Sequence, residues 1–454
     1  MKTLAFALAV AAVGFCVFGA HGVEKDPVSG LSLPPANTLA DNHVDSLLSS
    51  NKIIFIDGKP APAEVQQQVD SIRRRISLFY YDQFRHFNDP DAPYFLFMSK
   101  DAQLAMGIGG AVRMRGYYDW GGAVPAAGFA PYLIPIPADP ANMRSFNTTP
   151  SGTCLFFRVI GRNKALGDYQ LYIETNFTGY QGRDLKLKKA YAMINDVTIG
   201  YAPSTFSDPM ALPPTVDAQG PNNKITPTAV LVRYMPLVHR HWRLALSAET
   251  PSTAIDIDNK STGHVSNWLP DFAAFVQYEW AAGQHARLSG IVRTLPYRDL
   301  LEERNRNVVG WGLQLSGVGR PAPMLTLYAN AAYGHGYAGL GGDLLIGNYD
   351  LVADHTAPGR MYAPGMLGWC AGVQYNLRHN LFASLSASMT RYYPDEAEQA
   401  PSEYKQGLWG AANIFWNLTA RISAAAEFDL GRRTDFDGTS RWARRINIMA
   451  QFSF

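Results

Sequence analysis

Short segments in which apolar and polar residues alternate recur from about residue 100 to the end of the chain. In the last of them, every second side chain from Ile446 to Phe454 is apolar, while Arg445 and Asn447 occupy the opposite face. Successive side chains of a β-strand point to opposite faces, so this pattern predicts strands with one apolar and one water-facing side. The sixteen predicted strands are residues 102–119, 153–161, 168–179, 184–194, 196–203, 226–236, 241–250, 270–280, 284–294, 306–317, 322–333, 366–377, 380–392, 405–417, 420–431 and 441–454.

The connections between these strands alternate in length. The short ones include Asn195, Pro236–Arg240, Ala281–Gly283 and Leu418–Thr419, and the long ones include residues 120–152, 251–269 and 334–365. Short turns on one side, long loops on the other and an even strand number are typical of an outer-membrane barrel. A soluble β-sandwich or propeller shares the strand spacing but not this asymmetry. The sequence therefore predicts an all-β fold, a sixteen-stranded antiparallel transmembrane β-barrel.

The composition fits this interpretation. Hydrophobic residues make up 47% of the 454-residue chain and charged residues only 17%, yet the mean hydropathy is −0.12. A helical membrane protein needs several apolar runs of about 20 residues, and only the N-terminus has a run near that length. A polytopic helical membrane protein is therefore excluded, and a disordered chain is disfavoured. Sixteen strands also leave an aqueous lumen, whereas side chains fill a barrel of about eight.

The N-terminus predicts export. A basic residue precedes the apolar stretch Leu4–Phe18, and the small residues Ala20 and Gly22 follow at the spacing of a cleavage site. We interpret residues 1–22 as a secretory signal peptide, with a membrane-anchor helix as the alternative.

Residues 23–92 form a predicted N-terminal periplasmic segment ahead of the barrel domain, residues 93–454. Within this segment, apolar residues recur at a 4-3-4-3 spacing, at Val65, Val69, Ile72, Ile76 and Phe79. The spacing predicts a helix over about residues 62–86, which Asn88-Asp89-Pro90 ends. Its short apolar seam either associates with copies of itself as a coiled coil or packs on its own domain.

The faces opposite the apolar ones are predicted to line the lumen, and they are rich in cations. The candidate pore-lining and substrate-binding residues are Arg113, Arg115, Arg158, Lys186, Lys188, Arg233, Arg243, Arg287, Arg293 and Arg445. The acids on the same faces are fewer: Glu174, Glu249, Asp271, Glu279, Glu427 and Asp429. Fixed cations in a low-dielectric tube attract anions, and guanidinium groups bind carboxylates bidentately. The alternative is that these cations only pair with the acids and line water.

A proline-rich stretch follows the fifth predicted strand. Residues 204–225 contain four prolines and show no periodicity. A stiff loop of this length can fold inward as a constriction loop, which would place Asp208 and Asp217 opposite the arginines. The alternative is an ordinary external loop.

Nothing in the sequence indicates a catalytic residue, a metal site or a cofactor. There is no Gly-x-Ser-x-Gly motif, and His239 and His241 have no third ligand within reach in the sequence. The two cysteines of the mature chain, Cys154 and Cys370, lie on separate predicted strands, so no disulfide framework is expected. Nucleic acid is not an expected partner.

These observations predict an outer-membrane porin of a Gram-negative bacterium. It would be a passive diffusion channel for small hydrophilic solutes, with a preference for anions such as organic acids. One alternative is a structural or adhesive surface barrel whose long loops, above all residues 334–365, bind a partner. Another is an outer-membrane phospholipase or protease, which needs a Ser/His/acid set that the sequence does not show.

Several ordered pieces of the barrel sequence resemble one family. They are Leu185–Tyr191, Ser204–Pro221, Leu269–Asp271, Ser289–Arg293, Glu427–Arg433 and Arg444–Phe454, and the stretch from Thr205 to Pro221 is the most specific. In these pieces the chain is similar to the DcaP-like outer-membrane porins, trimeric relatives of the general porins associated with uptake of dicarboxylates and other anions. The resemblance implies a sixteen-stranded homotrimer in outer-membrane lipid, with Ser204–Lys224 as the constriction loop and the Val65–Phe79 seam as a periplasmic coiled coil. It also implies that Phe454 is the signal read by the barrel-assembly machinery.

Overall fold

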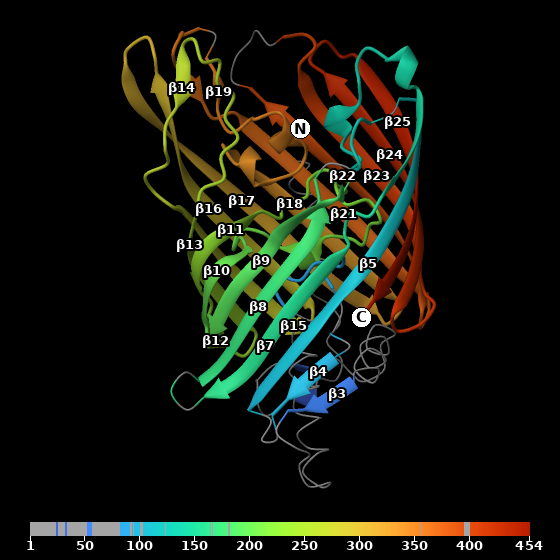
Figure 1. Cartoon of the computed structure of the whole chain (residues 1–454). Helices are drawn as coiled ribbons and strands as arrows, with labels where there is room; N and C mark the ends of the chain where they lie inside the picture. The colour runs from blue at the N-terminus through green and yellow to red at the C-terminus, as the bar shows by residue number, and fades with distance from the viewer. Residues whose placement is uncertain are drawn as a thin grey trace.

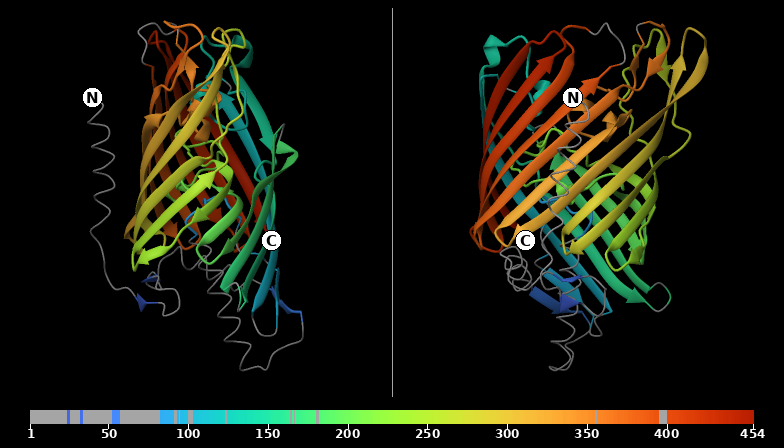
Figure 2. Two further views of the ribbon diagram at one scale, coloured as in Figure 1. Left: turned by 90° about the vertical axis from the view of Figure 1, so that its left-hand side faces the viewer. Right: turned by 180° about the vertical axis from the view of Figure 1, so that it is seen from behind.

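Sixteen antiparallel strands pair in chain order and close into a barrel in the computed structural model (Figure 1). The structure describes residues 24–25, 32–33, 52–56, 82–90, 93, 95–99, 103–122, 124–163, 165, 167–179, 182–354, 356–394 and 400–454. The barrel strands are β5 (Leu104–Trp120), β7 (Cys154–Asn163), β8 (Gly167–Thr178), β9 (Asp184–Ile194), β10 (Val197–Pro203), β11 (Thr228–Tyr234), β13 (Trp242–Glu249), β15 (Asp271–Ala281), β16 (Gln284–Asp299), β17 (Arg304–Ala322), β18 (Leu325–His335), β21 (Gly365–Arg378), β22 (Leu381–Tyr393), β23 (Tyr404–Asn417), β24 (Ile422–Asp435) and β25 (Ser440–Ser453). Seen from behind, the later strands form one continuous, tilted wall (Figure 2). The predicted sixteen-stranded antiparallel barrel is confirmed.

The barrel closes between its last strand and its first. β25 pairs with β5 from Arg444 opposite Trp120 to Ser453 opposite Ala111. Beyond this ladder, the backbone N–H and C=O of Phe454 each bond to Gly110 at 2.9 Å. Closure leaves the long sheet without a free edge, which is the condition for a β-sheet to lie in lipid.

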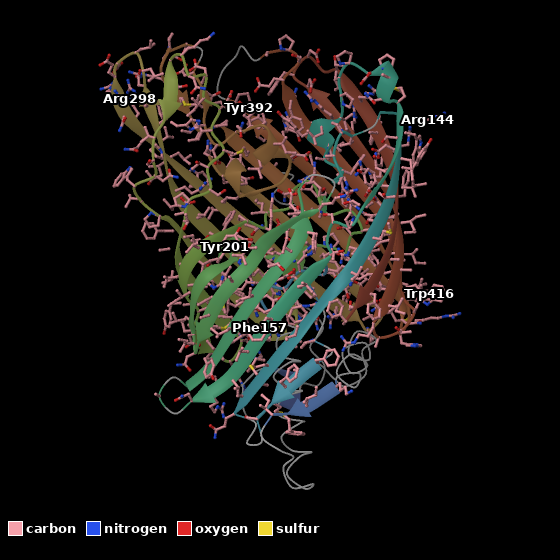
Figure 3. The ribbon with its side chains drawn as sticks, viewed as in Figure 1. Arg144, Phe157, Tyr201, Arg298, Tyr392 and Trp416 are labelled. Atoms are coloured by element: carbon pink, nitrogen blue, oxygen red, sulfur yellow. The ribbon has the colours of Figure 1, made fainter. Side chains whose placement is uncertain are left out.

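The two faces of the wall differ as the alternation predicts. On β5, Val112 and Met114 are more than half exposed on the outer face, whereas Arg115 and Asp119 are buried on the inner one. Exposed apolar residues continue around the barrel, and Trp416 lies near the end opposite the long loops (Figure 3). The outer face is therefore apolar and the inner face polar and charged.

Shorter elements surround the barrel. The short strands are β1 (Glu24–Lys25), β2 (Ser32–Leu33), β3 (Lys52–Phe55), β4 (Phe95–Met98), β6 (Arg144–Thr149), β12 (Leu237–His239), β14 (Thr262–His264), β19 (Val352–Ala353) and β20 (Met361–Tyr362). The helical turns are η2 (Pro131–Leu133), η3 (Pro140–Asn142), η5 (Pro209–Ala211), η6 (Ala338–Leu340) and α4 (Asp343–Ile346). In the described part of the chain, no helix is long and apolar enough to span a membrane.

An extension of the wall was not predicted from the sequence. β4 pairs antiparallel with the start of β5, and β3 pairs parallel with β4. Both strands lie below the barrel, at the end where the C-terminus lies (Figure 1). Because short turns gather at this end, it is the periplasmic end.

Residues 82–86, the end of the helix predicted over about residues 62–86, are not helical. Residues 82–86 form a turn, in which the backbone N–H of Arg85 donates to the carbonyl of Asp82 at 3.1 Å. The Asp82 side chain also accepts from the N–H of Phe84 at 3.2 Å, a local bond that competes with helix formation. The rest of the helix, with its Val65–Phe79 seam, lies outside the described residues, as does the signal peptide.

Residues 204–227, which we call the inward segment, lie inside the barrel between β10 and β11. The N–H of Ser204 donates to the carbonyl of Pro227 at 2.9 Å and closes its base. Two glycines on the inner face of β21 make room for it. A Cβ at Gly372 would lie 2.5 Å from Pro213, and one at Gly368 would overlap Asn223.

The barrel wall is formed by its shortest strands where the inward segment leaves it. β10 and β11 have 7 residues each and β13 has 8, whereas β16 has 16 and β17 has 19. In Figure 1 the green strands at the front therefore stop well below the rim formed by the taller strands.

Gly372→Leu is expected to push the inward segment off the wall, because the new side chain occupies the space of Pro213. In the folded wild-type protein the segment is buried, so trypsin should not cut after Lys224; in the variant it should. Gly116→Leu is the matched control, since a Cβ at Gly116 meets a single neighbour only at 4.0 Å. Cleavage is measured by mass spectrometry of the fragments. If folded Gly372→Leu were not cut after Lys224, the proposed packing of Pro213 against Gly372 would be contradicted.

Candidate functional site in the lumen

Ion pairs tie the inward segment to the wall at β5 and β25. The Asp217 carboxylate accepts from Arg115 Nη1 at 2.9 Å and from Arg445 Nη1 at 3.3 Å. Arg445 also donates to Asp119 through Nε at 2.6 Å and Nη2 at 2.9 Å. Burial alone would raise the pKa of Asp217, but Arg115 and Arg445 outweigh it and hold the pKa below its usual value. Asp217 is therefore an ionised anchor.

A second anchor lies on the far side of the lumen. Asp208 is bonded to His285 Nε2 at 2.8 Å and to Ser316 Oγ at 2.5 Å, with Arg287 Nη1 at 3.7 Å. Burial opposes ionisation, but Arg287 and His285 hold the pKa of Asp208 well below its usual value. Asp208 and Asp217 thus both face arginines, and the inward segment spans the lumen between them.

Most of the other predicted cations also have acidic or aromatic partners. Arg293 is bonded to Asp271 and Asp350, each at 3.0 Å. Arg158 lies over the Tyr172 ring, with its guanidinium carbon 4.9 Å from the ring centroid.

The remaining predicted cations differ in exposure. The Arg113 Nε donates to Gln451 at 2.7 Å, and the Arg233 guanidinium lies 3.7 Å from the Phe84 ring centroid. Arg243 is half-buried and Lys186 is exposed. Pairing with acids therefore does not account for every cation of the set, but it accounts for five: Arg115, Lys188, Arg287, Arg293 and Arg445.

A lysine that the alternation missed also points inward. A register shift in the β8–β9 ladder brings both Lys188 and Lys189 to the lumen. Lys188 Nζ lies 2.8 Å from Asp89 and 2.7 Å from Glu174, and Lys189 Nζ lies 2.7 Å from Asp89. A bulge puts two consecutive side chains on one face. The signal in the sequence was the adjacent Lys188-Lys189 pair, which breaks strict alternation.

Two neighbouring cavities run past these residues. The first, of about 250 Å³, is lined among the described residues by five cationic side chains and one carboxylate, Asp89. Its cations are Arg113, Arg115, Lys188, Lys189 and Lys224. The second, of about 200 Å³, is lined by residues at the periplasmic ends of the strands, such as Arg320 of β17 and Arg378 of β21. Both cavities share Arg113, His86, Asn88 and Asp89 in their lining, so they meet at these residues.

The described residues provide no metal centre. They contain no group of three or more His, Cys, Asp or Glu side chains that could hold a metal ion. What the lumen offers chemically is a cation-rich passage beside the inward segment.

Comparison with known proteins places this barrel among outer-membrane proteins. The sequence model of the family described as DcaP outer membrane protein matches residues 97–454. The solved outer membrane channel DcaP of Acinetobacter baumannii superposes with a TM-score of 0.67 at 21% identity, covering 79% of this chain and 99% of that one. A loop-deletion mutant of OmpT from Vibrio cholerae superposes with a TM-score of 0.50 at 9% identity, covering 78% and 100%. No curated protein matches the sequence.

Asp217→Ala is expected to loosen the inward segment, because it leaves Arg115 and Arg445 short of a buried carboxylate. Breaking a buried ion pair from one side costs about 3–5 kcal/mol. Hydrogen exchange of residues 204–226 should become faster, while exchange in the barrel strands stays unchanged. Asp258→Ala, in an exposed loop, should alter neither, and unchanged exchange in Asp217→Ala would show that Asp217 is not an anchor.

Proposed function

The chain belongs to the DcaP outer membrane protein family, and on that premise we propose that it is a passive diffusion channel that prefers small organic anions such as dicarboxylates. As a member of this family it resides in the outer membrane of a Gram-negative bacterium, and it is a porin-type barrel rather than an enzyme. We propose that residues 1–22 are the signal peptide that exports it and that the barrel domain begins near residue 93. The terminal Phe454 would be read by the barrel-assembly machinery.

The excess of cations along the passage is the main support for the proposed anion preference. Of the charged side chains that line the 250 Å³ cavity in the described residues, five are cationic and one is acidic. Apolar walls and low dielectric strengthen the field of such groups, so anions are concentrated and cations repelled. Lysine and arginine bind carboxylates through charge-assisted hydrogen bonds, which favours organic acids over neutral solutes.

The inward segment supplies the proposed size limit. It crosses the lumen between Asp208 and Asp217 and lines both cavities, for example through Pro209. Its five prolines restrict the backbone, and the buried ion pairs of Asp208 and Asp217 fix it at two points, so the passage beside it should have a defined width. One solved structure of similar fold, that of Acinetobacter baumannii, is itself called an outer membrane channel.

The short strands β10, β11 and β13 favour a homotrimer. A membrane-spanning strand needs about 9–11 residues, and β10, β11 and β13 have 7, 7 and 8. Their outer faces carry exposed apolar side chains such as Ile199, Val230 and Val232. Neighbouring copies would cover this side, where the strands are too short to span lipid.

The alternative of an adhesive surface barrel is less consistent with the long loop between β18 and β21. Residues 337–340, 343 and 344 of this loop are buried, and Leu344 packs in a core with Phe206 of the inward segment. A loop folded into the lumen presents little surface to a partner.

Arg113→Glu is expected to slow the entry of succinate into proteoliposomes relative to glucose. Reversing one charge about 8 Å from a permeating anion changes its energy by roughly 1 kcal/mol in a water-like dielectric, or about fivefold in rate. Arg144→Glu makes the same change at an exposed position on the outer rim (Figure 3) and should have no effect. Solute entry is measured as the rate of proteoliposome swelling. If the ratio of the succinate rate to the glucose rate were the same for wild type and Arg113→Glu, an anion path past Arg113 would be contradicted.

The pKa of Lys224 predicts that the anion preference of the channel depends on pH. Burial, reinforced by Lys188, lowers the pKa of Lys224 to about 8. Its positive charge is therefore present below pH 8 and lost above it, so the chloride-to-potassium permeability ratio should fall roughly twofold between pH 6 and pH 10. Lys224→Arg keeps the charge and should reduce this fall; a fall of the same size in both proteins would exclude Lys224 as its source.

A further inference from the structure

Residues 82–90, which precede the barrel strands, lie inside the lumen rather than beneath it. We call them the luminal segment. They contact three parts of the wall and the inward segment, and His86, Asn88 and Asp89 line both cavities of the passage. The segment therefore stands where an anion would pass from one cavity to the other.

Its first contact is with β11, β15 and β16. Arg287 Nη2 donates to Gln83 Oε1 at 2.9 Å, and Gln83 Nε2 donates to Glu279 at 3.1 Å. Phe84 packs in a buried cluster with Met235 and Phe275. This end of the luminal segment is held by both polar and apolar contacts.

Its second contact is with β22, β23 and the inward segment. The Phe87 ring packs edge-on against Phe382 and Phe415, with centroids 5.7 Å and 5.0 Å apart. Asn88 Nδ2 donates to the carbonyl of Thr215 at 3.3 Å. Phe87 is 37% exposed and contributes no buried core, so this contact is weaker than the first.

Its third contact is with the two lysines of β9. The Asp89 carboxylate lies 2.8 Å from Lys188 Nζ and 2.7 Å from Lys189 Nζ. Burial would raise the pKa of Asp89, but the two lysines outweigh it and hold the pKa well below its usual value. Glu174 alone would leave one of the two lysine charges uncompensated. The geometry is that of a carboxylate bound by two ammonium groups.

We propose that Lys188 and Lys189 form the carboxylate-binding site of the channel, and that Asp89 is a tethered carboxylate that occupies this site until a permeating organic anion displaces it. The proposal rests on the function proposed above. Exchanging one carboxylate for another keeps two carboxylates beside the two lysines, whereas a neutral solute would leave both lysines to share Glu174, which lies 2.7 Å from Lys188 and 3.7 Å from Lys189. The luminal segment thus makes passage depend on the anionic group of the solute.

Asp89→Asn tests the competition. A tethered group acts as a competitor at an effective concentration in the millimolar range, so removing its charge should lower the succinate concentration that halves the chloride current about three- to tenfold. Asp437→Asn makes the same change in an exposed turn and should behave as wild type. The double variant Asp89→Asn, Lys189→Gln should lose this increase in succinate affinity, because one of the two lysines of the site is then absent.

Folding of each variant is checked by its heat-dependent migration in gels. Hydrogen exchange of the unmodified protein supplies a second test. Succinate should accelerate exchange of the His86 N–H, which donates to Asp89 at 2.8 Å, and glucose should not.

The outcomes separate this proposal from the one on which it rests. In one case the wild-type channel prefers anions, but Asp89→Asn and Asp437→Asn need the same succinate concentration to halve the current, or succinate leaves exchange of the His86 N–H unchanged. Either result overturns the tethered carboxylate and leaves the proposed function standing. A wild-type protein without channels or without anion preference overturns both.

Discussion

The requirement that every backbone N–H and C=O in lipid be hydrogen-bonded within the protein determines this structure. A sheet meets it only by closing, and here β25 closes on β5 with Phe454 bonded to Gly110 beyond the last ladder pair. Closure makes one face of every strand external and the other internal. The alternation of apolar and polar residues along the sequence is the direct consequence, and the inner face becomes the place where charge collects.

Charge then organises the lumen. The chain as a whole carries a net charge of only +2, and its buried charged residues include many acids. The described lining of the 250 Å³ cavity, however, has five cations and one carboxylate. Carboxylates brought in by the inward and luminal segments, Asp208, Asp217 and Asp89, compensate part of the luminal cations and fix both segments in the lumen. The cations left in excess along the 250 Å³ cavity supply the proposed selectivity.

The strands could be predicted from the sequence because a two-residue period depends on each strand alone; β24 and β25 are examples. The inward course of residues 204–225 also followed from local chemistry, through its prolines. Three features depend on the closed barrel and carry no local signal: the parallel β3–β4 pair, the luminal position of residues 82–90, and the partners of Asp89. The bulge at Lys188-Lys189 reverses strict alternation, so Lys189 was missed. Helical periodicity likewise misassigned residues 82–86, where Asp82 forms a turn instead.

The most direct measurement is the zero-current potential of the wild-type protein in a planar bilayer between concentrated and dilute potassium chloride. A water-filled barrel whose passage carries an excess of fixed cations must give a potential of the sign set by chloride. A potential of the sign set by potassium, or a folded protein that opens no channels, would contradict the account.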